Sequence, residues 1–214
     1  MSINTDKYKI VPHAAVLLVQ KILEKTEPLA DTNVIYLEHV SRQQQNTSKT
    51  FVYDSRSTIE YLYGVGILHE IRRIKNDGRT VEDWKYKVHF YRSKAIDFLQ
   101  NLPLDENIYE ITYDDHMREI KINGKLLTKT YFGSDTDMLF EHVYTHPGIL
   151  LGKTSIEVAI DQKMRTLAAI VKDLKFVGVY REVFFPVVTK TQIKFVNPIT
   201  RRYALENHLP SLPL

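Results

Sequence analysis

The hydrophobic periodicity changes several times along residues 118–196 of this 214-residue chain, and the order of those changes restricts the fold more than any single motif. Polar and apolar side chains alternate over residues 118–127, which predicts a β-hairpin. Its centre, Asn123-Gly124, is the dipeptide that type I′ turns prefer, because both turn positions need positive φ. Apolar side chains then recur at helical spacing over residues 134–146, 154–160 and 163–176, and alternation returns over residues 183–196. This order predicts an α+β fold in which a second hairpin follows three helices.

Polar residues at the expected helix starts support this division. Ser134 with Asp137 three residues later resembles a capping box, in which side chains satisfy the free N–H groups of the first turn. Thr154 with Glu157 repeats that spacing, and Asp161 is expected to cap the third helix. All three helices therefore have a predicted first turn.

The first half of the chain has a similar order of elements. Residues 14–25 are predicted as a helix, and Thr32 is expected to cap a second helix over residues 33–42. Residues 55–63 are predicted as a short helix, which Gly64-Val-Gly66 would end because glycine adopts a left-handed conformation without strain. The loop over residues 43–49 is longer than the turn of a tight helix-turn-helix.

A basic hairpin and a last helix complete the first half. Residues 69–75 and 84–90 alternate with a period of two around a polar turn at residues 76–78, and a helix is predicted over residues 94–102. Residues 103–107 are short and polar, and we expect the domain boundary there.

Both halves therefore show the order of a winged helix-turn-helix. We predict tandem winged helix-turn-helix domains of the α+β class, the first over residues 8–102 and the second over residues 108–200. The second domain is expected to begin with a β-hairpin.

The composition excludes several classes of protein. The chain has no cysteine, so it contains neither disulfides nor thiolate metal sites, and this suits a reducing cytoplasm. No window approaches the roughly 18 apolar residues of a membrane span, and the N-terminus lacks the pattern of a secretory signal. We therefore expect a cytoplasmic protein that does not bind membranes. Residues 1–104 carry 15 Lys or Arg against 12 Asp or Glu, and residues 105–214 carry 14 of each, so any binding to a polyanion requires local clusters of charge.

Two segments resemble known families of regulators. Residues 108–196 resemble the effector domain of OmpR/PhoB-type response regulators, through Arg-Glu-Ile-Lys-Ile-Asn-Gly-Lys-Leu-Leu at 118–127 and Asp-Met-Leu-Phe-Glu-His-Val-Tyr-Thr-His-Pro-Gly at 137–148. Residues 12–102 are more loosely similar to MarR- or ArsR-type winged helices, through Ser-Thr-Ile-Glu-Tyr-Leu-Tyr-Gly-Val-Gly-Ile-Leu at 57–68. The resemblance implies binding to duplex DNA. No receiver domain with a phosphorylatable aspartate precedes the second segment, so control by phosphorylation is not implied.

Duplex binding requires a helix in the major groove and cations directed at phosphates. We expect the helix over residues 163–176 to enter the groove, with Arg165 reading bases, and the two hairpins to contact flanking phosphates. The candidate DNA-binding residues are Arg56, Ser57, Tyr61, Arg72, Arg73, Lys75, Arg79, Lys85, Lys87, Lys163, Arg165, Thr166, Lys172, Lys190 and Lys194.

Other kinds of site have weaker support. Asp114-Asp115-His116 is either a metal site or a polar hairpin tip, and the second interpretation is the more common one. Tyr131-Phe132 and Phe184-Phe185 are candidate stacking platforms for single strands, although adjacent strand positions would turn one ring of each pair into the core. The outward ring is equally suited to a protein interface. We expect no catalysis, no cofactor and no resident metal.

The sequence thus predicts a non-enzymatic protein that binds double-stranded DNA, with transcriptional regulation as the expected use. Tandem winged helices also serve as protein-interaction scaffolds, as in accessory subunits of chromosome-condensing complexes. A replication initiator of plasmid type has the same architecture. A protein partner or a homodimer is compatible with each alternative.

Overall fold

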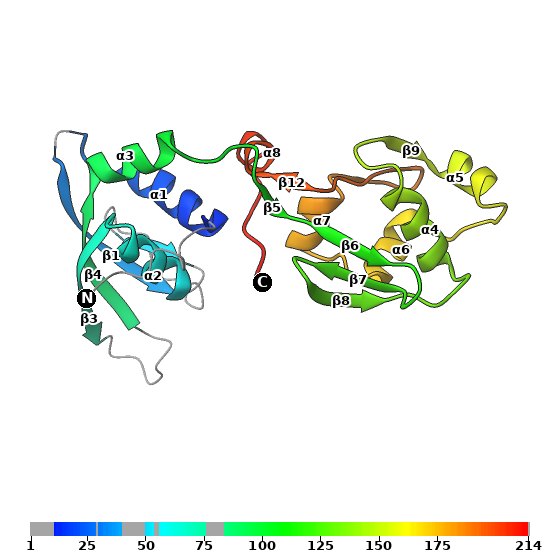
Figure 1. Cartoon of the computed structure of the whole chain (residues 1–214), viewed down its shortest axis with the longest axis horizontal. Coiled ribbons are helices and arrows are strands. Elements are labelled where there is room, and N and C mark those ends of the chain that lie inside the picture. The colour runs from blue at the N-terminus through cyan, green and yellow to red at the C-terminus, as the bar shows by residue number, and fades with distance from the viewer. Residues whose placement is uncertain (1–10, 29, 40–49, 54–55, 76–83, 214) are drawn as a thin grey trace. The chain divides into compact units, whose positions relative to one another are not determined.

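The computed structural model describes residues 11–28, 30–39, 50–53, 56–75 and 84–213 (Figure 1). The chain divides into two compact units, unit 1 over residues 1–103 and unit 2 over residues 104–214, and each is described by itself. The division lies at the start of the segment predicted as a domain boundary. Both units mix helices with strands, so the α+β class is confirmed.

Unit 1 contains one four-stranded sheet and three helices among its described residues. Its elements are α1 (His13–Lys25), β1 (Thr32–His39), β2 (Thr50–Tyr53), α2 (Arg56–Gly64), β3 (Leu68–Lys75), β4 (Trp84–Tyr91) and α3 (Arg92–Gln100). The strand order is β2-β1-β4-β3, with β1 parallel to β2 and the other neighbours antiparallel. The helices pack against one face of the sheet, where Leu37 and Phe90 share an apolar core with Val19 and Leu62.

The predicted helix over residues 33–42 is wrong. Its described part, up to His39, is strand β1, which pairs with β4 along most of its length. Ile35 and Leu37 are fully buried on one face, whereas Val34 and Tyr36 lie on the other, so these residues follow the period of a strand. Pairing with distant strands outweighs the local helical signal. Residues 40–42, the loop at 43–49 and the turn at 76–78 lie outside the described residues.

The remaining predicted elements of unit 1 are confirmed, with small shifts of their ends. The first helix, the short helix and both strands of the basic hairpin occur where alternation and helical spacing place them. Helix α2 ends at Gly64, and Gly66 has a φ of +77°. The last helix begins at Arg92, two residues before its predicted start.

Unit 2 contains three small antiparallel sheets and five helices among its described residues. Its elements are β5 (Asn107–Tyr109), β6 (Ile111–Asp114), β7 (Glu119–Ile122), β8 (Lys125–Lys129), α4 (Asp135–Tyr144), β9 (Leu150–Gly152), α5 (Lys153–Ala159), α6 (Leu167–Asp173), α7 (Val179–Phe184), β10 (Val187–Val188), β11 (Gln192–Lys194), β12 (Ile199–Thr200) and α8 (Arg201–Glu206). The sheets have the orders β6-β7-β8, β10-β11-β9 and β12-β5. Within this unit, α8 lies with β5 and β12 at one end, and β9 lies with α5 at the opposite end (Figure 1).

An aromatic cluster forms the centre of unit 2. The ring of Phe140 on α4 lies 6.2 Å from that of Phe176 and 5.9 Å from that of Phe195, measured between centroids. Phe185, at the end of α7, lies 4.9 Å from Phe176 and 5.1 Å from Phe195. These contacts join α4 to the segments that follow α6, α7 and β11, so one core positions all of them.

Two asparagine side chains hold the β5–β6 segment in place. Asn123 accepts a hydrogen bond from the Glu110 amide at 2.8 Å and donates to the Ile108 carbonyl at 3.0 Å. Asn197 accepts from the Ile111 amide at 2.7 Å and donates to the Ile111 carbonyl at 3.0 Å. The backbone groups of this segment are thereby satisfied where no neighbouring strand pairs with them.

Several local predictions for unit 2 are confirmed. Asn123 and Gly124 both have positive φ, of +46° and +79°, as a type I′ turn requires. Ser134 caps α4, because its hydroxyl accepts from the Asp137 amide at 3.3 Å. The Asp137 carboxylate does not complete a capping box, since it accepts from the Gly133 amide instead.

The predicted starts of the next two helices are wrong. Helix α5 is preceded by Gly152, and the Glu157 carboxylate accepts from the Met164 amide rather than from its own helix start. Helix α6 begins at Leu167 after Thr166, and Asp161 lies in the preceding loop with a φ of +53°.

The last predicted hairpin is shorter than expected. Val183 and Phe184 end helix α7, and the paired strands are limited to Val187–Val188 and Gln192–Lys194. None of the helices in the described parts of the chain has the length and apolar character needed to cross a membrane.

Candidate nucleic-acid interface

Helices α5 and α6 of unit 2 are joined by a loop over residues 160–166, and Asp135 in the first turn of α4 holds that loop. One oxygen of Asp135 accepts from the side-chain amide of Gln162 at 3.0 Å. The other accepts from Nε of Arg165 at 3.2 Å. The loop is therefore fixed to α4 by side chains rather than by backbone pairing.

Arg165 lies in this loop and not on a helix, which corrects the predicted position. Its Nη1 donates to Asp173 on α6 at 2.9 Å, in addition to the bond with Asp135. The Asp173 carboxylate first, and Asp135 second, raise the pKa of the Arg165 guanidinium. A guanidinium that bridges two carboxylates is occupied, so Arg165 positions α6 against α4 instead of projecting toward a ligand.

Lys163 and Thr166 also precede α6, contrary to the prediction that they lie on the helix. Lys163 is 3.6 Å from the Glu157 carboxylate on α5. Thr166 occupies the N-cap position of α6. The pKa of Glu157 is lowered, mainly by the hydrogen bond from the Met164 amide. Of the four candidate DNA-binding residues predicted on this helix, Lys172 alone lies on α6.

The outer face of α6 carries small side chains, one lysine and the exposed Asp173 carboxylate that pairs with Arg165. Leu167, Ile170 and Val171 are buried in the core of unit 2. Ala168 and Lys172, one turn apart, are exposed, and Ala169 is half-buried. Small side chains let the helix backbone come close to another molecule.

The β10–β11 hairpin carries two of the predicted cations. Its turn is held by the Thr189 hydroxyl, which accepts from the amides of Thr191 and Gln192. Lys190 is exposed in that turn, and Lys194 is half-buried on β11. Among the described residues, no acidic side chain forms an ion pair with Lys172, Lys190 or Lys194. These three lysines remain available to an anionic ligand.

The predicted residues on α2 of unit 1 have other roles or other neighbours. Arg56 forms an ion pair with Glu60 at 2.9 Å, one turn further along the helix. Tyr61 is buried and its ring lies 6.3 Å from that of Phe98, so the structure places it in the core of unit 1 and not on the surface of the helix. Ser57 is exposed on the same helix.

The predicted basic cluster of unit 1 is divided between the two faces of its sheet. Register places Tyr36, Lys87 and Arg72 in one row across β1, β4 and β3. Arg73 is opposite Tyr86, which packs against the core, and therefore lies on the other face. The backbone of Lys75 belongs to β3, but its side chain and all of Arg79 lie outside the described residues.

Lys85 shares the face of Arg72 and Lys87 but is already paired. Its ammonium lies 2.6 Å from the Glu38 carboxylate and 5.0 Å from the centroid of the Tyr36 ring. The free cationic surface on this face is therefore smaller than the sequence suggests.

A buried carboxylate in unit 2 connects the β6–β7–β8 sheet to α4. Asp137 accepts from the Thr130 hydroxyl at 2.7 Å, the Tyr113 hydroxyl at 2.9 Å and Nη1 of Arg118 at 3.3 Å. Burial raises the pKa of the Tyr113 phenol, and the hydrogen bond to that phenol raises the pKa of Arg118. The sequence marked Asp137 only as a capping residue, so this network was missed.

The two aromatic pairs do not follow the predicted arrangement of one ring inward and one outward. Phe184 and Phe185 are both buried, whereas Tyr131 and Phe132 are each 84% exposed. Neither pair lies within a strand: the first ends α7 and the second lies in a turn before α4. The period of two therefore does not apply to them.

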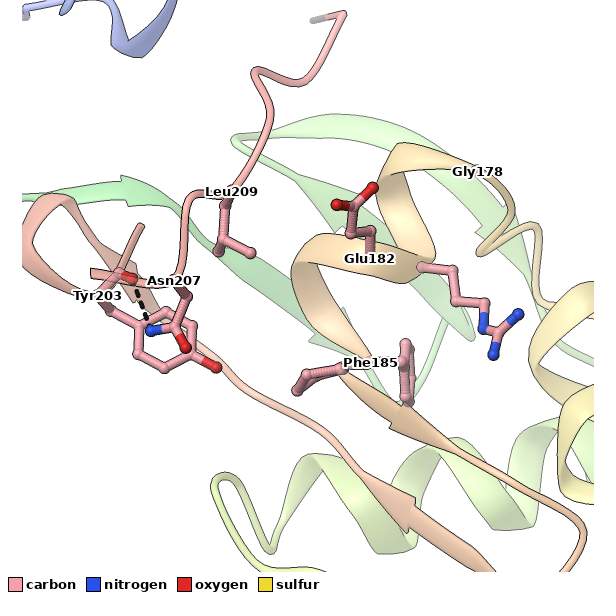
Figure 2. Close-up of a pocket in the computed structure, with 8 residues that line it drawn as sticks. Gly178, Glu182, Phe185, Tyr203, Asn207 and Leu209 are labelled. Carbon is pink, nitrogen blue, oxygen red and sulfur yellow. Dashed lines mark hydrogen bonds between the residues drawn. The ribbon is translucent and has the colours of Figure 1, made fainter. Parts of the chain in front are cut away.

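A pocket of about 450 Å³ lies between α7 and the C-terminal part of unit 2 (Figure 2). Glu182 and Phe185 line it from one side, and Tyr203, Asn207 and Leu209 line it from the other. Asn207 donates to the Tyr203 carbonyl at 2.9 Å, and burial raises the pKa of the Tyr203 phenol. The volume of the pocket falls in the range of small-molecule binding sites. No sequence motif marks the pocket, because its walls come from two separate segments, 178–186 and 203–209.

Asp114 ends β6, and Asp115 and His116 follow it in the turn that leads to β7. The Asp114 carboxylate accepts from the amides of His116 and Met117 at 3.0 and 2.9 Å, as a polar hairpin tip requires. Within the described ranges, no group of three or more His, Asp or Glu side chains is placed to hold a metal ion.

Comparisons with known proteins returned no match for this chain, whether against family models, curated proteins or solved structures.

Proposed function

We propose that unit 2 binds duplex DNA as a winged helix-turn-helix module. The observation that carries this proposal is the pairing of β9, which directly precedes α5, with β11 in the sheet β10-β11-β9. Helix α4, strand β9, helices α5 and α6 and the β10–β11 hairpin then follow one another in the order of a winged helix. Helix α7, between α6 and β10, is an addition to that order.

In this proposal α6 enters the major groove and the β10–β11 hairpin is the wing. Ala168 and Ala169 have short side chains, so the backbone of α6 can approach the base edges closely. Lys172 on the helix, Lys190 in the wing turn and Lys194 on β11 contact phosphates. The proposal is limited to unit 2, since the described part of unit 1 has strand β1 where a second helix was expected.

Arg165 has a different role from the one expected from sequence. Its bonds to Asp135 and Asp173 hold α6 at a fixed distance from α4, so the residue acts on DNA through the position of the helix. Transcriptional regulation is the use that best fits a duplex-binding module of this kind, although fold alone does not fix function.

The test is the salt dependence of binding to a labelled mixed-sequence duplex, measured by fluorescence anisotropy. Each phosphate contact contributes about −0.9 to the slope of log affinity against log salt concentration. The combined variant Lys172→Ala, Lys190→Ala and Lys194→Ala is therefore expected to make the slope shallower by about 2.7. Lys125→Ala, which removes an exposed lysine from β8, is the control and should leave the slope unchanged.

Two results would contradict the proposed interface. Equal slopes for the triple variant and the wild type would show that these lysines do not contact phosphates. Absence of binding at low salt would instead favour the alternative of a protein-interaction scaffold.

A further inference from the structure

The pocket between α7 and the C-terminal part of unit 2 contains two opposite charges that the protein leaves unpaired. Arg181 and Glu182 both line it from α7, and both residues are exposed. Among the described residues, neither side chain forms an ion pair. The Arg181 guanidinium makes one long hydrogen bond, from Nη2 to the Val188 carbonyl at 3.4 Å. A cation and an anion are therefore both accessible to a ligand in this pocket.

The other walls of the pocket supply apolar surface and neutral polar groups. Phe185, Pro186 and Leu209 provide the apolar surface. The side-chain amide of Asn207 donates to the Tyr203 carbonyl at 2.9 Å, which leaves its own oxygen, Oδ1, without a hydrogen bond to any described residue. The Tyr203 hydroxyl likewise has no partner in the described part of the chain, and both residues lie across the pocket from Phe185 (Figure 2). Apolar walls with a few polar groups that orient the ligand are typical of small-molecule sites.

We infer that this pocket binds a short peptide with free termini, a dipeptide or tripeptide with apolar side chains. A ligand with a carboxylate alone would pair with Arg181 and leave Glu182 facing a like charge, and a ligand with an amine alone would do the reverse. A zwitterion satisfies both groups. Its C-terminal carboxylate accepts two parallel hydrogen bonds from the Arg181 guanidinium, and its N-terminal ammonium donates to the Glu182 carboxylate.

The separation of the two charges selects a peptide rather than a single amino acid. Consecutive helix residues project about 100° apart, so the side chains of Arg181 and Glu182 diverge from α7. The two charged groups of an amino acid are bonded to one carbon, whereas the ends of an extended dipeptide or tripeptide lie about 7–10 Å apart. The Asn207 amide has a donor and an acceptor, which matches a peptide unit, and the Tyr203 hydroxyl adds a further donor. A volume of about 450 Å³ accommodates a ligand of this size.

Two pocket residues also contact the β10–β11 hairpin, so occupancy of the pocket has a readout outside it. The Val188 carbonyl that accepts from Arg181 belongs to β10. The ring of Phe185 lies 5.1 Å from that of Phe195, which directly follows β11. A charge-assisted pair with a carboxylate is stronger than the 3.4 Å bond to a carbonyl, so the ligand draws Arg181 away from Val188. The environment of the Val188 backbone therefore changes when the peptide binds.

Titration of the isotope-labelled full chain with the dipeptide leucyl-phenylalanine, followed by amide chemical shifts in NMR spectra, tests this inference. The amide signals of residues 178–188 and 203–209 are expected to shift, with a dissociation constant on the order of 0.1 mM, as for a ligand of about 20 non-hydrogen atoms. The C-terminal amide and the N-acetyl derivative of the same dipeptide each lack one charge. Each derivative should bind the wild type at least about tenfold more weakly, because hydrogen bonds to charged groups are the stronger ones.

Variants of the two charged residues assign each end of the peptide. Arg181→Gln should bind the free dipeptide and its amide with equal affinity, and Glu182→Gln should do so for the free and the acetylated dipeptide. The controls Lys125→Gln and Glu206→Gln remove exposed charges that do not line the pocket and should bind like the wild type.

Three results would overturn the inference. The first is the absence of these shifts at about 10 mM dipeptide, roughly a hundred times the expected dissociation constant. The second is equal binding of the free and the acetylated dipeptide to the wild type, which would assign the pocket to simple carboxylates. The third is unchanged discrimination between the free dipeptide and its amide in Arg181→Gln. No step involves DNA, so these results leave the proposed function of unit 2 to its own test.

Discussion

The buried carboxylate of Asp137 offers the most demanding test of how unit 2 is held together. Asp137 is 2% exposed and accepts hydrogen bonds from Thr130, Tyr113, Arg118 and the Gly133 amide. These donors come from the β6–β7–β8 sheet and from the turn before α4. Asp137→Ala removes the one acceptor that they share.

The expected loss of stability follows from leaving those partners unpaired. Removing one member of a buried ion pair costs about 3–5 kcal/mol, and the expected cost here lies at the lower end because Arg118 keeps the Glu141 carboxylate at 3.3 Å while the Thr130 and Tyr113 hydroxyls lose their acceptor. The total stability of a domain is typically about 5–15 kcal/mol, so this is a large part of it. Asp137→Asn keeps the shape and one carbonyl acceptor, and its expected cost is smaller, about 1–3 kcal/mol.

The assay is urea unfolding of the full chain, with hydrogen exchange of α4 and β7 amides to assign the transition to unit 2. The control is Asp105→Ala, which removes an exposed ion pair with Arg202 and should cost less than about 1 kcal/mol. If Asp137→Ala changes the free energy of unfolding by no more than the control, the carboxylate does not stabilise the sheet–helix contact, and the reasoning fails.

Two further predictions concern unit 2. Asn197→Ala removes both hydrogen bonds to the Ile111 backbone and should lower the free energy of urea unfolding by about 1–3 kcal/mol; an unchanged midpoint would show that water replaces the amide. Burial, and next the charge of His146, lower the pKa of His142 in the folded state from its ordinary 6.5. The unfolded chain therefore binds more protons below that value, and the contribution of His142 to stability is present above pH 6.5 and lost as the pH falls. His142→Gln should accordingly lose less stability than the wild type between pH 7.5 and 5 in urea titrations, and identical losses would refute this assignment.

The features that sequence predicted well are those set by neighbouring residues. The turn at Asn123-Gly124 depends on the φ preference of its own two residues, and the start of α4 depends on the hydroxyl of Ser134. Glycine at position 66 likewise marks the end of α2 through its own backbone. Such signals need no knowledge of the rest of the chain.

The features that sequence missed depend on distant partners. Ile35 and Leu37 are strand residues because β4, some fifty positions later, pairs with them. The Arg165 guanidinium is paired with the carboxylates of Asp135 and Asp173, which lie in other segments of the chain, so the local sequence does not indicate this pairing. The basic cluster of unit 1 is divided because Arg72 and Arg73 are consecutive in a strand and must face opposite sides.

The predicted arrangement of the aromatic pairs, with one ring buried and one exposed, was wrong for a related reason. Phe184 and Phe185 follow one another at the end of a helix, where adjacent side chains can both reach a core that surrounds them. Tyr131 and Phe132 belong to a turn whose backbone is fixed by Asp137. The sequence identified both pairs but not the backbone that carries them.

The proposed DNA interface is tested most directly by one measurement, the affinity of the full wild-type chain for a labelled mixed-sequence duplex at about 50 and about 200 mM salt. Three phosphate contacts give a slope of about −2.7, so this fourfold rise in salt should weaken binding roughly fortyfold. Steep weakening of that size is the predicted result. Affinity that does not change with salt, or no binding at 50 mM, would contradict the account.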